Sequence, residues 1–327
     1  MKLISTRRHF LQLAATVSAA GFSPIGRTQT APLRMVVSWP AGGITDSVAR
    51  LLAERMAPIL KRQINIDNRP GAGGQIGATH LKNLPPDGEV VMLGSINETM
   101  LSAVTHKKLP YEPLKDLQPV SLIMESPSIL AVPANGPNTM AEFFAWVKEN
   151  PSNVTIGVPG LGTPTFFLGL MLGARLGFSA NMIPFAGGAP LATGLAGSQV
   201  VAALQTFGPD FINMHNSGRI KIIAFTGDKR STMPQFSHLP TFAEAGLPTI
   251  PSVWFGLFLP AGAKPETVQT WHQALTEVLG KDDVRARLAE FGLITRTSTP
   301  QEFADLMRRD TVVWTDIVKR TGFQQIG

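Results

Sequence analysis

The sequence predicts an α/β fold built as two lobes with a cleft between them. Three observations support this prediction. Short apolar strands alternate with helix-like patterns, two longer β-like runs interrupt the alternation, and three helical patterns close the C-terminal part. Alternating strands and helices are typical of layered α/β domains with largely parallel sheets. We interpret the two long runs, Val120 to Val132 and Val253 to Leu259, as crossings between lobes.

The first lobe is predicted to begin with strands that end in turn residues. The first strand is closed by a proline and two glycines, and the next segment has apolar residues at helical spacing. The third strand follows a proline–glycine turn. The expected strands are Leu33 to Trp39, Ile64 to Ile66 and Glu89 to Gly94, and the expected helices are Thr45 to Leu60 and Gln75 to Asn83.

The second lobe repeats this alternation before the chain returns to the first. We expect helices at Met140 to Glu149 and Phe166 to Leu176, and strands at Val154 to Val158, up to Pro184, Val200 to Gln205 and Ile220 to Thr226. The closing helices are Pro265 to Leu279, Asp282 to Phe291 and Pro300 to Lys319. The predicted division is therefore residues 31–128 with 250–327 in one lobe and 129–249 in the other. The cleft would lie at the carboxyl ends of parallel strands, where open α/β sheets bind ligands.

Residues 1–30 are predicted to be an export signal. Arg7 and Arg8 precede Phe10 and Leu11, and an uncharged run follows as far as Ala20. This pattern is typical of twin-arginine signals, and the run is shorter than the roughly 20 apolar residues that a membrane-spanning helix needs. The alternative, an amphipathic first helix with a chance arginine pair, explains the spacing less well. We therefore expect a periplasmic protein exported by the twin-arginine route.

Composition narrows the classes of partner. The formal net charge is +6, but four of the 29 basic residues lie in the first 30 positions, which hold no acid. The remaining 25 basic and 23 acidic residues nearly balance, so the concentrated basic surface of a nucleic-acid-binding protein is not expected. The chain has no cysteine, which excludes disulfides, thiolate metal sites and a lipoprotein anchor.

Patterns that would indicate catalysis are missing. There is no Gly-x-Ser-x-Gly motif, and the histidines never stand at metal-binding spacings. We expect no catalytic residues, no cofactor and no metal. The scattered histidines are His9, His80, His106, His215, His238 and His272.

Two glycine-rich loops are the positive signal. Gly42 and Gly43 stand between an expected strand and an expected helix, and Gly160 to Thr165 repeats this arrangement in the second lobe. Free N–H groups and the helix dipole at such a junction favour an anion, and glycine lets a ligand approach the backbone. The alternative is an ordinary turn capped by Thr45 or Asp46. One such loop in each lobe favours a binding site.

Several stretches closely resemble the Bug family, the periplasmic substrate-binding proteins of tripartite tricarboxylate transporters. They form an ordered series over nearly the whole chain after residue 30. The matching stretches are Pro40 to Asp46, Asp67 to Ala78, Pro86 to Gly88, Leu109 to Tyr111, Leu239 to Pro248 and Trp254 to Phe258. The resemblance implies a type II periplasmic-binding-protein fold, the two-lobed Venus flytrap, closing over a small carboxylate.

The resemblance also implies which residues hold the ligand. Ala41, Gly42, Gly43, Thr45 and Asp46 would contact it from the first lobe, with Asn97 as a further candidate. From the second lobe the implied contacts are Gly162, Thr163 and Thr165. Asp46 would repel an anion, so it either braces its loop or receives the amine of an amino-acid-like ligand.

Three positions depart from the family pattern. A histidine is replaced by Phe166, the Tyr-Lys-Gly sequence by Phe185-Ala186-Gly187, and an aspartate by Val201. We therefore hypothesise a ligand less charged than a tricarboxylate, with Phe166, Phe185 and Phe207 packing on an apolar body. The alternative is that these rings face the core. Phe185 is the one we assign to the binding site.

Three functions remain open from the sequence. The first is a monomeric binding protein that delivers a small carboxylate to membrane transporter subunits. The second is a ligand sensor or scavenger that signals to a membrane receptor. The third is an exported enzyme, which the absence of any cofactor fingerprint disfavours.

Overall fold

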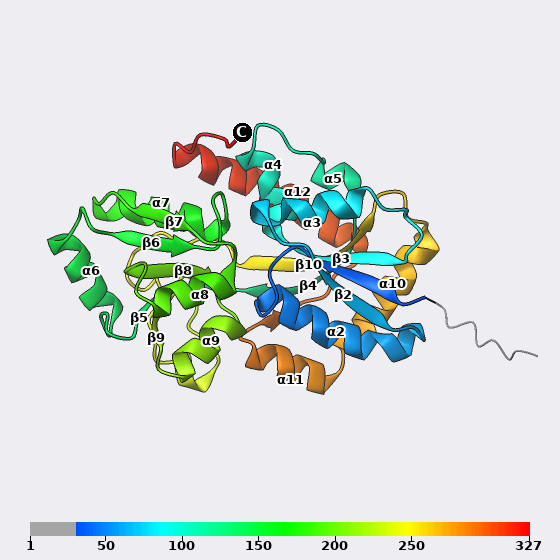
Figure 1. The fold of residues 1–327 in the computed structure, drawn as a ribbon, viewed down its shortest axis with the longest axis horizontal. Coiled ribbons are helices and arrows are strands. Elements are labelled where there is room, and N and C mark those ends of the chain that lie inside the picture. Colours follow the sequence, from blue (N-terminus) through cyan, green and yellow to red (C-terminus); the bar gives the residue numbers. More distant parts are fainter. Residues whose placement is uncertain (1–30) are drawn as a thin grey trace, which may run out of the picture. The chain divides into compact units, whose positions relative to one another are not determined.

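The computed structural model describes residues 31–327, and Pro32–Gly327 form one compact unit with two β-sheets and helices packed on both (Figure 1). Residues 1–30, where the export signal is predicted, lie outside the described residues. From residue 31 onward, no helix has both the length and the apolar character needed to cross a membrane. The two sheets and their helices confirm the predicted α/β class, whereas the exact lobe boundaries stay a prediction.

The first sheet contains six strands. They are β1 (Leu33–Val37), β2 (Ile64–Asn68), β3 (Val90–Ser95), β4 (Leu117–Ser126), β10 (Val253–Pro260) and β11 (Ile294–Thr295). Its helices are α2 (Ile44–Leu60), α3 (Gln75–Lys82), α4 (Ser102–Thr105), α5 (Pro113–Asp116), α10 (Pro265–Leu279), α11 (Asp282–Glu290) and α12 (Pro300–Arg320), with a short 3-10 turn at Ala72–Gly74 and a π-helical turn at Asn97–Leu101. The strand order is β11-β4-β10-β3-β1-β2. Figure 1 shows α3 and α12 along one side of this sheet, and α2 and α11 along the other.

The second sheet contains five strands in the order β7-β6-β8-β5-β9. They are β5 (Ser128–Pro133), β6 (Thr155–Val158), β7 (Asn181–Pro184), β8 (Ala202–Thr206) and β9 (Ile220–Phe225). Its helices are α6 (Met140–Glu149), α7 (Pro164–Leu176), α8 (Gly188–Ala196) and α9 (Pro209–Asn216), followed by a 3-10 turn at Pro234–Phe236. The sequence patterns did not predict α8 and α9, which are short.

Both sheets are more mixed than the largely parallel sheets expected from the sequence. β1, β2 and β3 pair in parallel, as do β6, β7 and β8, but β10 runs antiparallel to β3 and β4, and β5 runs antiparallel to β8 and β9. The reversed strands β5 and β10 are those that bring the chain in from the other sheet. The chain leaves a sheet at the carboxyl ends of its strands and enters the next sheet at that same edge, so the arriving strand runs in reverse. The two predicted crossings explain the antiparallel pairs of β5 and β10, while the short edge strand β11 is also antiparallel to β4.

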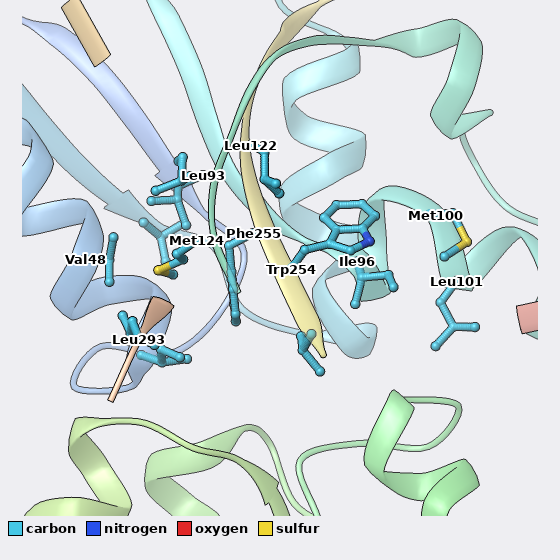
Figure 2. Packing of buried hydrophobic residues seen from close by; sticks show 14 of the residues in the cluster. Val48, Leu93, Ile96, Met100, Leu101, Leu122, Met124, Trp254, Phe255 and Leu293 are labelled. Atoms are coloured by element: carbon cyan, nitrogen blue, oxygen red, sulfur yellow. The ribbon is translucent and has the colours of Figure 1, made fainter. Parts of the chain in front are cut away.

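Strand β10 lies inside the first sheet, between β4 and β3. Side chains alternate along the strand, and Figure 2 shows Trp254 and Phe255 leaving it in different directions. The Trp254 ring packs edge-on against Phe303 of α12, with 5.3 Å between centroids, and its Nε1 donates to Asp310 Oδ2 at 2.6 Å. At Gly256 a Cβ would lie 2.1 Å from the Phe303 ring, so only glycine lets α12 pack so closely.

Candidate functional site

One cavity lies where the carboxyl ends of the first-sheet strands meet elements of the second sheet. Its cavity volume is about 50 Å³. It is lined by Trp39, Pro40, Gly43, Ile44 and Thr45 after β1, Ser95, Ile96 and Asn97 at the end of β3, Pro159, Thr163, Pro164 and Thr165 after β6, Gly188 and Ala189 at the start of α8, Gln205, Thr206 and Asp210 at the end of β8 and in α9, and Val253 and Phe255 of β10.

Helix α2 begins at this cavity without a capping side chain. Gly42 has a φ of +84°, a left-handed conformation that favours glycine, and Gly43 is the extended N-cap residue. No side chain caps the helix, so its first-turn N–H groups are not satisfied by a capping oxygen. Thr45 is buried, and its Oγ1 has no hydrogen-bond partner. This loop therefore offers hydrogen-bond donors and the positive end of a helix dipole to an anion.

Asp46 braces this loop and is not among the residues lining the cavity. Its carboxylate accepts hydrogen bonds from the Arg50 guanidinium at 2.9 and 3.0 Å, from Gly42 N at 3.0 Å and from Asn68 Nδ2 at 3.0 Å. Burial by itself would raise the pKa of Asp46, but these hydrogen bonds and the Arg50 charge outweigh it and lower the pKa. These contacts, and the absence of Asp46 from the cavity lining, favour a role in bracing the loop over a role in binding a ligand amine.

Helix α7 presents a second uncapped start to the cavity. Thr163 is its extended N-cap residue, Pro164 follows, and no side chain caps the helix. Thr163 Oγ1 donates to Gly160 O at 2.9 Å, and Thr163 and Thr165 are both 1% exposed. Gly162, with a φ of +69°, lies against Thr105 of α4 and does not line the cavity. Thus α2 and α7, one from each sheet, direct their N-termini to the same cavity.

Asn97 and Trp39 complete the first-sheet side. Asn97 Nδ2 donates to Gly73 O, while Asn97 Oδ1 is buried without a partner. Trp39 Nε1 donates to the buried carboxyl of Glu98 at 3.3 Å. Ser38 Oγ and Ser95 N also donate to Glu98. Burial raises the pKa of Glu98, and these hydrogen bonds oppose the rise.

The second-sheet side holds two residues that the sequence motifs did not indicate. Gln205 and Asp210 are 3% and 9% exposed, and both line the cavity. Gln205 Oε1 and Asp210 Oδ2 are buried without hydrogen-bond partners. Burial raises the pKa of Asp210 to about 6, against the opposing hydrogen bond that the Phe211 amide donates to Oδ1. A buried, perturbed carboxyl group in a cavity is a frequent mark of a functional site.

The sequence matches a known receptor family over most of its length. Residues 48–323 match the family model described as tripartite tricarboxylate transporter family receptor. The chain belongs to this family. Protein BugT of Bordetella pertussis is 29% identical over 294 residues, which are 89% of each chain. This receptor therefore belongs with the Bug proteins, as its motifs predicted.

Two solved structures of relatives contain carboxylates. The R. palustris protein Rpa4515, solved with adipate, is 28% identical and has a TM-score of 0.86, covering 91% of this chain and 99% of that one. MatC (Rpa3494) from Rhodopseudomonas palustris, with bound malate, is 30% identical and has a TM-score of 0.80, covering 88% and 98%. The family and these relatives comprise binding proteins rather than enzymes.

The residues implied by the family resemblance divide into two groups in this receptor. Gly43, Thr45, Asn97, Thr163 and Thr165 line the cavity together. The remaining implied residues, which are not among those lining it, are Ala41, Gly42, Asp46, Gly162 and Phe185. The exposed Ala41 and Gly42 shape the loop from outside.

The three phenylalanines that replace or accompany family positions pack into the core. Phe185 is half-buried against the second hydrophobic cluster and lies over Gly157 and Gly194. Phe166 contacts Phe167 and Phe323 edge-on, and Phe207 contacts Phe225 and Phe236 in the same way. This packing favours the alternative in which the rings face the core.

The cavity lacks a basic side chain. Among its lining residues Asp210 is the only ionisable one, so no lysine, arginine or histidine from the described part of the chain lines it. Residues 31–327 contain no group of three or more His, Asp or Glu side chains that could hold a metal ion. Recognition of an anion here must rely on neutral donors: backbone N–H groups, hydroxyls and the side-chain amides of Asn97 and Gln205.

Proposed function

We propose that this receptor captures a small carboxylate-bearing metabolite outside the cytoplasm and delivers it to the membrane subunits of a tripartite tricarboxylate-type transporter. The observation that supports this most directly is the pair of uncapped helix starts, α2 and α7, at one cavity whose lining holds buried polar atoms without partners. Adipate and malate in two relatives give the same chemical class.

The proposed mechanism uses the ligand to bridge two lobes. Residues 31–128 with 250–327 would form one lobe and residues 129–249 the other. A carboxylate held by Thr45 of α2 and Thr165 of α7 contacts both, which shifts an open–closed equilibrium toward the closed form. The membrane subunits would accept that form of the monomeric receptor.

A thermal-shift screen of the purified receptor tests the binding function. The ligands are aliphatic and aromatic mono-, di- and tricarboxylates and amino acids. A ligand that binds only the folded state stabilises it by about 2.7 kcal/mol at one hundred times its Kd. A selective rise in Tm with one carboxylate class supports the proposal. Protein freed of co-purified ligand that responds to none of them contradicts it.

Delivery and export need separate tests. Deletion of the gene should abolish uptake of the identified ligand, and complementation with the full chain should restore it. A cell that keeps uptake but loses its response to the ligand would indicate a sensor instead.

We also propose periplasmic export by the twin-arginine route. Replacing Arg7 and Arg8 by lysine should then leave the protein in the cytoplasm.

A further inference from the structure

The charge of the cavity constrains the ligand more than the family match does. Asp210 is its one ionisable lining residue within residues 31–327, and no basic side chain balances it. The two helix starts account for one carboxylate. A second carboxylate placed near Asp210 would meet a like charge in a poorly solvated space.

The second-sheet side of the cavity offers acceptors that lack donors. Gln205 Oε1 and Asp210 Oδ2 are both buried and unpartnered. Asp210 uses its other oxygen, Oδ1, to accept from Phe211 N at 3.0 Å, so the capping of α9 leaves Oδ2 free for another partner. Buried acceptors in native proteins nearly always accept a hydrogen bond, and a buried acceptor without one lowers stability.

Gly188 lets the side chains of Gln205 and Asp210 approach the start of α8 closely. Gly188 lies at the start of α8, where a Cβ would be 2.2 Å from Gln205 Nε2 and 2.4 Å from Asp210 Oδ2. The absence of a side chain at Gly188 therefore keeps room for both polar groups at the cavity wall. Gly188, Gln205 and Asp210 come from three elements, so they form one subsite only in the folded protein.

We propose that Asp210 and Gln205 form a subsite for a ligand ammonium group, so that the receptor takes a carboxylate of amino-acid type. This inference rests on the proposed function, because the carboxylate of the same ligand is held by the starts of α2 and α7. The ammonium supplies donors to Gln205 Oε1 and Asp210 Oδ2 and neutralises Asp210. Asp46, the aspartate that the sequence suggested for an amine, is already paired with Arg50.

The proposal predicts a particular dependence on pH. The groups that face Asp210 are neutral: the Phe211 amide, the Gln205 side chain and the first residues of α8, with Ile44 of α2 packed beside Gly208. With the pKa of Asp210 at about 6, most molecules carry the carboxylate at pH 7.5 and roughly a tenth at pH 5. An ammonium ligand binds the ionised form, so its affinity should fall about tenfold between these values.

The test compares four matched ligand series by titration calorimetry at pH 7.5 and pH 5. The series are unsubstituted monocarboxylates, α-amino acids, ω-amino acids and dicarboxylates, each with three to six carbons. The proteins are the full receptor, Asp210→Asn, and Asp228→Asn as a control that removes an exposed aspartate of the same region. We expect one amino series to bind at least tenfold more tightly than the matched mono- and dicarboxylates at pH 7.5. Asp210→Asn should lose that preference and its pH dependence, whereas Asp228→Asn keeps both.

The possible results test the ammonium subsite separately from the proposed function. Tight binding of a dicarboxylate or an unsubstituted monocarboxylate, without preference for the amino series, overturns the ammonium subsite and leaves the proposed function standing. An amino preference that survives Asp210→Asn overturns the assignment to Asp210. Failure of every series to bind correctly folded receptor overturns the ammonium subsite, whereas the proposed function is overturned only if the broader thermal-shift screen, with its tricarboxylates and aromatic acids, also finds no ligand.

Discussion

Two aspartates in the first turns of two helices acquire opposite properties from their surroundings. Asp46 is held by Arg50, Asn68 and a backbone amide, which together lower its pKa despite its burial. Asp210 is buried among neutral groups, and burial raises its pKa to about 6. The Asp46 carboxylate, with both oxygens hydrogen-bonded, supports its loop, while Asp210 keeps Oδ2 available to a ligand.

Asp210→Asn should stabilise the ligand-free receptor at neutral and higher pH. The pKa of Asp210 is raised on folding, so its contribution to stability is fully present below the unfolded value near 3.8 and is lost as pH rises through about 6. A difference of about two pKa units corresponds to roughly 3 kcal/mol. Thermal denaturation should show a higher Tm for the variant at pH 8 and nearly equal values at pH 4. A lower Tm of the variant at pH 8 would contradict this account.

Asp46→Asn should destabilise the receptor and weaken ligand binding at neutral pH. The pKa of Asp46 is lowered on folding, so its stabilising effect is present above about 3.8 and disappears as the pH falls through the folded value. Loss of its charged hydrogen bonds, discounted for the exposure of Arg50, should cost about 1–3 kcal/mol in urea denaturation. The control is Asp316→Asn, which removes an exposed pair with Arg320 and should change stability by less than about 0.5 kcal/mol.

At the scale of elements, the site depends on where helices begin. α2, α7 and α8 all start without a capping side chain, and lining residues stand at or next to the first residue of each. A capping Ser or Asp would satisfy the first-turn N–H groups internally. Glycine at the starts of α2 and α8, and Thr163 at α7, whose hydroxyl donates to Gly160 O instead, leave them available to a ligand.

Gly188→Ala should lower ligand affinity without unfolding the receptor. Its Cβ would push Gln205 and Asp210 from their present positions at the cavity wall, so we expect binding to weaken on the order of tenfold. Gly197→Ala, at the other end of α8, is the matched control, because its Cβ would lie 3.5 Å from Thr193 O in ordinary contact. Equal affinities of the two variants, measured by calorimetry, would show that Gly188 does not shape the site.

The loops of the site could be predicted from the sequence, whereas its acidic side could not. A strand, a glycine-rich turn and a helix form a local pattern, so the sequence is sufficient to indicate the two loops, and the family resemblance implies the contacts Gly43, Thr45, Thr163 and Thr165 within them. Gln205 and Asp210 carry no local signal, because their importance arises from β8 ending opposite β1. Helix α8 is not predicted because its sequence, GAPLATGLA, consists mainly of small residues and has no clear apolar stripe.

At the scale of the whole molecule, the chain passes from the first sheet to the second through a single residue. Ser126 ends β4 in the first sheet, Ser128 begins β5 in the second, and Pro127 lies between them. Ser126 Oγ donates to Phe207 O at 2.6 Å, and Phe207 N donates to Pro127 O at 2.8 Å. The junction is thereby tied to the end of β8, which carries Gln205.

Ligand binding should protect both sides of the cavity at once. If a ligand bridges two lobes, amide hydrogen exchange should slow in residues 40–46 and 160–166 together, because both loops lose the same opening motion. Helix α12, which contributes no lining residue, serves as the internal control. Protection confined to one of the loops, measured by mass spectrometry, would contradict bridging.

The interior position of β10 has a consequence for the order of folding. The strands of the second sheet all come from residues 128–225, a single continuous stretch of chain. The first sheet has β10 between β3 and β4, so its central strand is made more than 150 residues after β3. During synthesis the second sheet has all its strands while the first still has a gap in its middle. The first sheet, whose strands begin the described chain, is therefore the last of the two sheets to be completed.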